Sequence, residues 1–204
     1  MAYTAGTGFR YWKNINGRVE DPAGIPVRIA NSTTLRVGDV VRVNTAGFLV
    51  TNGATAPAAG ILLGFQDENG INPFSLGYGS RTASTLTGDD TLGTSATNQT
   101  RADYINGMVA IDPSGTMLWL NDASADLALT NVFQFYDIDS TSRQIDAATN
   151  GDANGIFQLI VWDPKGTSVE VNNPVAADAS FGAFRMNENQ FSGGIDTGTA
   201  KNAA

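Results

Sequence analysis

The sequence predicts an all-β protein built from antiparallel hairpins, and two observations carry this prediction. Residues 107–121 and 158–172 each contain an apolar run, a four-residue turn and a second run in which apolar and polar residues alternate. From Asp112 and from Asp163 onward, both segments read D-P-x-G-T-x-[LMV]-x-[LV]-N. Asp, Pro and Gly occupy the positions that a type I turn favours. No apolar pattern of helical spacing extends beyond two turns. We therefore expect each of the two segments to form a similar hairpin within a β scaffold.

Composition excludes several kinds of active site. The chain of 204 residues contains no Cys and no His, which removes disulfides, thiolate nucleophiles, His general bases and the commonest metal ligand. A pair of carboxylates could still hydrolyse a glycosidic bond. The acidic pairs Asp67-Glu68 and Asp89-Asp90 are adjacent in sequence, so on a strand their side chains point to opposite faces. We therefore expect no enzymatic activity and no catalytic residue.

Residues 137–148 begin like a calcium-binding loop, with Asp137 and Asp139 at the first and third positions. Such a loop needs Gly at its sixth position and Glu at its twelfth. This chain has Ser142 and Ala148 there. A solvated β-turn explains the segment better, and we expect no bound metal and no cofactor.

Charge and the N-terminal sequence narrow the choice of partner. A net charge of −8 disfavours nucleic acid. Basic residues nevertheless outnumber acidic ones in residues 1–50, which is either an ordinary solvated surface or a basic face for an acidic partner. The N-terminus lacks the regions of a signal peptide, and no apolar run is long enough to span a membrane. We expect synthesis in the cytoplasm and no membrane partner.

Residues 1–24 are predicted to form an extended N-terminal arm punctuated by glycines. The arm carries a group of aromatic and basic side chains, namely Phe9, Arg10, Tyr11, Trp12 and Lys13, followed by Arg18. Exposed aromatic side chains favour burial. They pack either against the body of the same chain or against another subunit.

Residues 25–173 are predicted to form the β body. Its first strands are expected at residues 26–30, 34–37, 40–43 and 48–51, with a turn at 44–47. Residues 60–65 read G-I-L-L-G-F, a short and wholly apolar run that predicts a strand buried on both faces. Residues 66–105 are rich in Thr, Ser, Gly, Asp and Asn, and we expect a long loop or two-stranded flap there.

The second half of the chain is also predicted to consist mainly of strands and turns. Between the two hairpins we expect one helical turn at 122–128, a strand at 132–138 and a turn region at 147–155. Residues 174–204 are predicted to form a C-terminal tail. Its aromatic side chains suggest docking, and they are Phe181, Phe184 and Phe191. We expect roughly the last ten residues to be flexible.

Four aromatic residues lie in or near the hairpins: Trp119, Trp162, Tyr104 and Tyr136. They are candidates for a platform on which sugar rings stack. Residues placed in this way on antiparallel hairpins more often pack in the core or against a cross-strand partner. Core packing is therefore the preferred interpretation, and a carbohydrate site is the alternative.

Several of these segments resemble the capsid decoration proteins, also called cement or head-stabilisation proteins, of tailed bacteriophages. The similar segments are T-L-R-V-G-D-V-V at 34–41, N-T-A-G-F-L-V at 44–50 and A-A-G-I-L-L-G-F at 58–65. The segment G-I-F-Q-L-I-V-W-D-P at 155–164, together with V-E-V-N at 169–172, is similar to the closing hairpin of such virion proteins.

The resemblance implies a small β-barrel or β-tulip body and a non-enzymatic protein bound to the capsid exterior, commonly as a homotrimer. Its partners would be the major capsid protein and sister protomers. The expected contact residues are Phe9, Arg10, Tyr11, Trp12, Lys13, Arg18, Phe181, Phe184 and Phe191. The alternative function is a carbohydrate-binding or host-adhesion module, such as a head fibre or a receptor-binding component. Another structural role in the virion, such as tail tube or collar, fits the same features.

Overall fold

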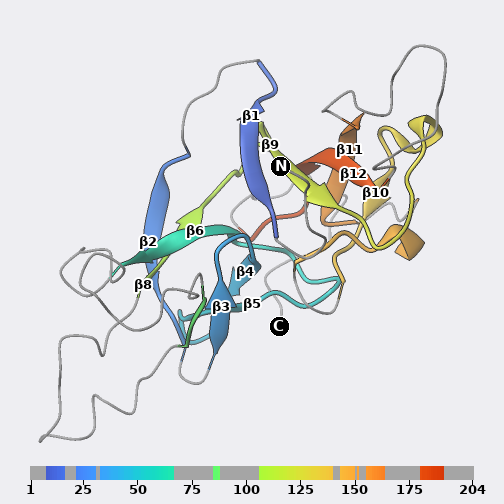
Figure 1. The fold of residues 1–204 in the computed structure, drawn as a ribbon. Coiled ribbons are helices and arrows are strands. Elements are labelled where there is room, and N and C mark those ends of the chain that lie inside the picture. The colour runs from blue at the N-terminus through green and yellow to red at the C-terminus, as the bar shows by residue number, and fades with distance from the viewer. Residues whose placement is uncertain are drawn as a thin grey trace, which may run out of the picture.

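The computed structural model describes residues 8–16, 22–30, 33–66, 85–87, 106–139, 143–149, 151, 155–163 and 180–190. Within these residues the predicted all-β fold class is confirmed. The strands form two five-stranded antiparallel sheets and a two-stranded ribbon (Figure 1). The described helices are two short 3-10 turns, η3 (Leu129–Asn131) and η4 (Ala147–Thr149). None of the described helices is long and apolar enough to cross a membrane.

Sheet A has the strand order β1-β9-β12-β11-β10. Its strands are β1 (Arg10–Asn14), β9 (Met117–Asp122), β12 (Phe181–Met186), β11 (Phe157–Trp162) and β10 (Phe135–Tyr136). The register slips by one residue at Trp12 of β1 and at Ile160 of β11. Such bulges bend a strand and increase its twist.

Sheet B has the strand order β2-β8-β6-β4-β5. Its strands are β2 (Gly24–Arg28), β8 (Asn106–Ala110), β6 (Gly60–Gln66), β4 (Val40–Val43) and β5 (Leu49–Thr51). The turn predicted at 44–47 joins β4 to β5, and Gly47 takes a φ of 86° there. A separate ribbon pairs β3 (Thr34–Arg36) with β7 (Thr85–Thr87). Of the flap predicted at 66–105, the structure describes Gln66, at the end of β6, and the three residues of β7. The other residues of this segment lie outside the described residues.

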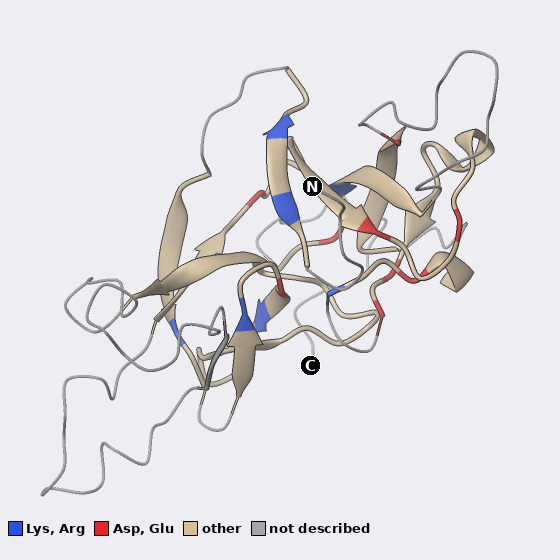
Figure 2. Cartoon of the chain, in the orientation of Figure 1, with Lys and Arg blue, Asp and Glu red and all other residues tan. Residues whose placement is uncertain are grey.

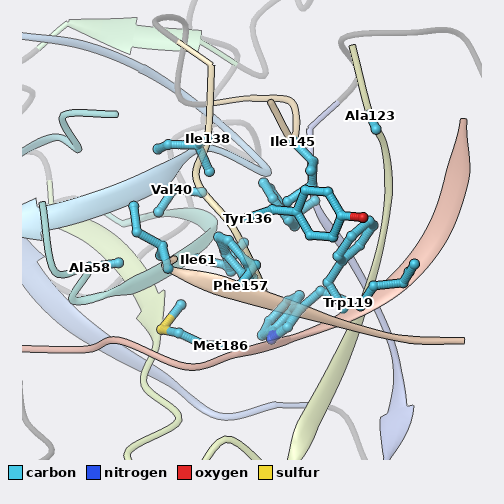
Figure 3. Close-up of a cluster of buried hydrophobic side chains, with 14 of the residues drawn as sticks. Val40, Ala58, Ile61, Trp119, Ala123, Tyr136, Ile138, Ile145, Phe157 and Met186 are labelled. Atoms are coloured by element: carbon cyan, nitrogen blue, oxygen red, sulfur yellow. The ribbon is translucent and has the colours of Figure 1, made fainter. Parts of the chain in front are cut away.

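The central strands of sheet B are buried on both faces, as the apolar run at 60–65 predicts. Val40 and Ile61 are cross-strand neighbours, and they pack toward sheet A in the larger hydrophobic cluster (Figure 3). Val41 and Leu62, the next residues along each strand, belong to a second cluster with Leu35 of β3. Successive side chains of a strand alternate between its faces, so sheet B forms a middle layer that separates two cores.

The first repeated segment does not form a hairpin, so this prediction is wrong. Strand β8 pairs with β2 and β6 in sheet B, whereas β9 pairs with β1 and β12 in sheet A. The D-P-S-G-T turn itself forms, because the Asp112 carboxylate accepts the amides of Thr116 (2.9 Å) and Met117 (2.7 Å). It serves as a corner that carries the chain from one sheet to the other. In the second segment, β11 lies in sheet A and residues 164–179 lie outside the described residues.

Both predicted appendages contribute strands to sheet A. In the predicted arm, β1 pairs with β9 in the register Tyr11 to Trp119. In the predicted tail, β12 lies between β9 and β11. The described parts of residues 1–24 and 174–204 therefore complete the body, because sheet A needs these strands to cover the larger core.

The segment between β9 and β11 also differs from prediction. Asp122 ends β9, and the predicted helical turn at 122–128 is replaced by η3 further along. The predicted strand at 132–138 contracts to β10, because Phe133 has a φ of 69° and interrupts the extended backbone.

A buried ion pair joins the two sheets. Asp39 lies in the turn between β3 and β4, and its carboxylate pairs with the Arg143 guanidinium. The Arg143 carbonyl accepts a hydrogen bond from Asn121 of β9 (2.9 Å). Burial raises the pKa of Asp39 to about 6, although the amide of Arg36 and the Arg143 charge act in the opposite direction. The pair therefore links sheet B to sheet A through a carboxyl group whose pKa is about 6.

We expect the Asp39 carboxyl to stabilise the fold more strongly as the pH falls. Its folded-state pKa is above its unfolded value of 3.8, so the folded chain holds the proton more tightly between pH 4 and 6. The free energy of unfolding of the natural chain should rise relative to Asp39→Asn between pH 7.5 and 4.5, by at most about 3 kcal/mol. Urea denaturation of both proteins measures this. A relative loss of stability at low pH would show that the Arg143 attraction outweighs burial.

We also expect Gly60 of β6 to be intolerant of a side chain. A Cβ atom there would overlap the Ala110 carbonyl oxygen of β8, whereas a Cβ atom at Gly64 of the same strand meets nothing within 4 Å. Gly60→Ala should lower the free energy of unfolding by about 3 kcal/mol through overpacking. Gly64→Ala is the matched control and should change it by less than about 0.5 kcal/mol. Equal effects in urea denaturation would contradict the close approach of β6 and β8.

Candidate functional site

Three of the nine predicted contact residues lie inside the body, so their assignment to a partner surface is wrong. Phe9 is buried and stacks on Phe157, with ring centroids 4.5 Å apart. Phe184 is fully buried and meets the Tyr136 ring edge to face. Phe181 is likewise fully buried. Arg18 and Phe191 lie outside the described residues.

The other four predicted contact residues lie on β1 and divide between its two faces. Tyr11 points inward and packs edge to face on Trp119, with ring centroids 5.7 Å apart. Arg10 is exposed, and Trp12 and Lys13 are half-buried. The Lys13 ammonium lies 4.0 Å from the centre of the Trp12 ring, a cation–π contact that holds both side chains at the surface.

Ile15 extends this surface beyond the end of β1. Its side chain is 49% exposed, and its amide donates to the Thr116 carbonyl (2.8 Å), which fixes the backbone against the start of β9. We call Arg10, Trp12, Lys13 and Ile15 the β1 patch. Figure 2 shows the basic positions on this strand. The patch combines positive charge with accessible apolar area, a composition suited to a protein contact.

A second exposed surface was not predicted from the sequence. Leu129 of η3 and Phe133 are 69% and 64% exposed, and Asp126 is exposed nearby in the chain. We call Asp126, Leu129 and Phe133 the 126–133 patch. Large apolar side chains at the surface are informative when they gather in one segment. The residues V-F-Q-F-Y read as strand in the sequence, so no local signal shows that Phe133 faces solvent.

The backbone of Phe133 is strained and firmly held. Its φ of 69° is unusual for a bulky residue. Its amide donates to the Leu159 carbonyl (2.7 Å), and its carbonyl accepts from the Gln158 side-chain amide (2.9 Å). These two bonds to β11 hold a conformation that costs on the order of 1–3 kcal/mol. The exposed ring is therefore presented from a fixed position.

The two patches carry opposite charge. The β1 patch contains Arg10 and Lys13, whereas residues 121–142 contain no Lys or Arg and include four aspartates. Asp122 and Asp137 are buried, so the exposed Asp126 carries the negative charge of the 126–133 patch. Within the described part of the chain, no three acidic side chains gather as a metal site. The Asp139 carboxylate accepts the amide of Arg143 (3.3 Å).

The alternative sugar platform does not form from its predicted aromatics. Trp119 and Tyr136 are fully buried in the larger cluster, and Trp162 is half-buried against it. Tyr104 lies outside the described residues. The preferred interpretation of Trp119 and Tyr136, core packing, is confirmed.

We expect Phe133→Asn to leave the fold intact and to stabilise it by up to about 1 kcal/mol. Asn adopts positive φ more readily than Phe, and the exposed ring contributes little to the core. Leu129→Asn removes a side chain of similar exposure without positive φ and should be neutral. Urea denaturation measures both free energies of unfolding. Destabilisation by Phe133→Asn of more than about 1 kcal/mol would show that the ring packs within the body.

No protein-family model, curated protein or solved structure matches this chain in sequence or fold.

Proposed function

We propose that this chain is a structural virion protein that binds the outside of a phage capsid lattice and stabilises it through apolar and electrostatic contacts. Its partners would be the major capsid protein and sister protomers, in a homotrimer on the capsid exterior, without enzymatic activity. The observation that carries the proposal is the exposure of fixed apolar and charged side chains at the two ends of sheet A. A rigid β body with surfaces of this kind is suited to assembly.

Two physical features support a role in assembly. The β1 and 126–133 patches are held by backbone hydrogen bonds, as at Ile15 and Phe133, so little conformational entropy is lost when they dock. Aromatic and basic side chains are those that most often dominate binding energy in protein interfaces, and Phe133 is exposed while Trp12 is half-buried at the surface. The adhesion alternative receives less support, because Trp119 and Tyr136 are unavailable to a sugar.

The fold determines which variants can test this function. Deletion of residues 2–24 would remove β1 from sheet A and Phe9 from the core. Such a deletion is expected to damage the body itself, so any loss of binding would be ambiguous. Surface substitutions that leave β1 in place are therefore the appropriate test.

We expect the natural chain to co-sediment with capsids prepared without it, and the double variant Arg10→Glu, Lys13→Glu to bind at least tenfold more weakly. Reversal of both charges removes the attraction of the β1 patch for an acidic surface. Ile25→Ser is the control, since Ile25 is 50% exposed on β2 of the other sheet. Absence of the natural chain from the capsid pellet at all concentrations would refute the proposed function.

A further inference from the structure

The two patches lie at opposite ends of one sheet. Strand β1 is the first strand of sheet A and β10 is the last, and the 126–133 patch directly precedes β10 in the chain. Figure 1 shows β1 and β10 on either side of β9, β12 and β11. With neighbouring strands about 4.8 Å apart, the two edges are separated by about 19 Å. Neither patch can therefore cover the other within one molecule.

The patches are complementary in charge and in apolar content. One is basic, through Arg10 and Lys13, and the other is acidic, through the exposed Asp126. The described residues expose four large hydrophobic side chains, of which Ile15, Leu129 and Phe133 belong to these two patches. Matched charge favours a specific encounter, and burial of the apolar side chains supplies affinity.

We propose that the β1 patch of one copy of this chain docks on the 126–133 patch of a second copy. The occupant is a second copy because each chain carries both complementary surfaces. The contact joins two different patches, so it is heterologous: it leaves one free patch of each kind at the ends of a pair, and it closes into a ring when the rotation allows.

The structure of β1 indicates side-chain docking rather than extension of the sheet. The bulge at Trp12 interrupts the regular edge, and Lys13 places a charge there. Bulges and edge lysines oppose the pairing of one strand edge with another. The Trp12 ring, held by the Lys13 ammonium, and the Phe133 ring, held by the bonds of its backbone to β11, are the expected centres of the contact.

This inference takes from the proposed function only the expectation that copies associate. It names a sister protomer as the partner of the β1 patch, so the weaker capsid binding expected of Arg10→Glu, Lys13→Glu would follow from lost association between copies. It can be tested without a capsid. Sedimentation velocity of the full chain, from micromolar to millimolar concentration, should show concentration-dependent assembly that weakens at high salt. Lys13→Glu, Asp126→Lys and Phe133→Asn should each raise the dissociation constant at least tenfold. Ile25→Ser should leave it unchanged, with far-UV circular dichroism confirming that every variant is folded.

Two combinations test the pairing itself. Lys13→Glu and Asp126→Lys placed together in one chain should restore assembly, because the reversed charges again attract. A mixture of Lys13→Glu chains and Phe133→Asn chains retains one intact patch of each kind. It should therefore form heterodimers and nothing larger.

Three results would overturn the proposal. They are a natural chain that stays monomeric at every concentration, assembly that none of the patch substitutions weakens, and homodimers of the Lys13→Glu chain as stable as the natural assembly. The last would indicate a contact between identical patches. Capsid binding by a chain that stays monomeric would refute this inference and the homotrimer, but it would leave the proposed binding to the capsid standing, so the two failures are distinguishable.

Discussion

The burial of sheet B on both faces is the constraint on which the rest of the structure depends. Its central strands carry apolar side chains in consecutive positions, as at Val40-Val41 and Ile61-Leu62, and consecutive positions face opposite ways. A sheet of this composition needs cover on both sides. Sheet A covers one face, and Leu35 of the β3–β7 ribbon joins the cluster on the other. The corner at Asp112 follows from this requirement, because the chain must cross from the sheet in the middle to the sheet that covers it.

Local turn chemistry was predictable from the sequence, whereas the pairing of strands was not. Asp112 and Asn44 form the turns that their flanking residues indicate. The strands on either side of Asp112 nevertheless belong to different sheets. A four-residue turn fixes the path of the chain over a few ångströms, but the choice of partner strand depends on apolar surface contributed by residues far away in sequence. An identical turn motif can therefore close a hairpin or join two layers.

The candidate site was half predictable for the same reason. The aromatic and basic group in residues 9–13 marks a surface strand, yet period-2 alternation buries Phe9, packs the partly buried Tyr11 against the larger core and leaves Arg10 accessible. Phe181 and Phe184 are predicted in a tail because they lie in a background of small residues after Pro174. Their strand is defined by its neighbours β9 and β11. Phe133 gave no signal, since its backbone conformation is imposed by hydrogen bonds from β11.

The position of β12 in the centre of sheet A has a consequence for the order in which the protein folds during synthesis. All strands of sheet B are available once residue 110 has left the ribosome, whereas β9 and β11 obtain their shared neighbour only when residues 181–186 emerge. Domains generally begin to fold from the N-terminal side as the chain grows. Sheet B can thus settle first, while β1, although translated earliest, must wait for a partner made much later. The N-terminal strand therefore finds its place only after the strands of sheet B have been made, when β9 supplies its partner, and β10, β11 and β12 follow.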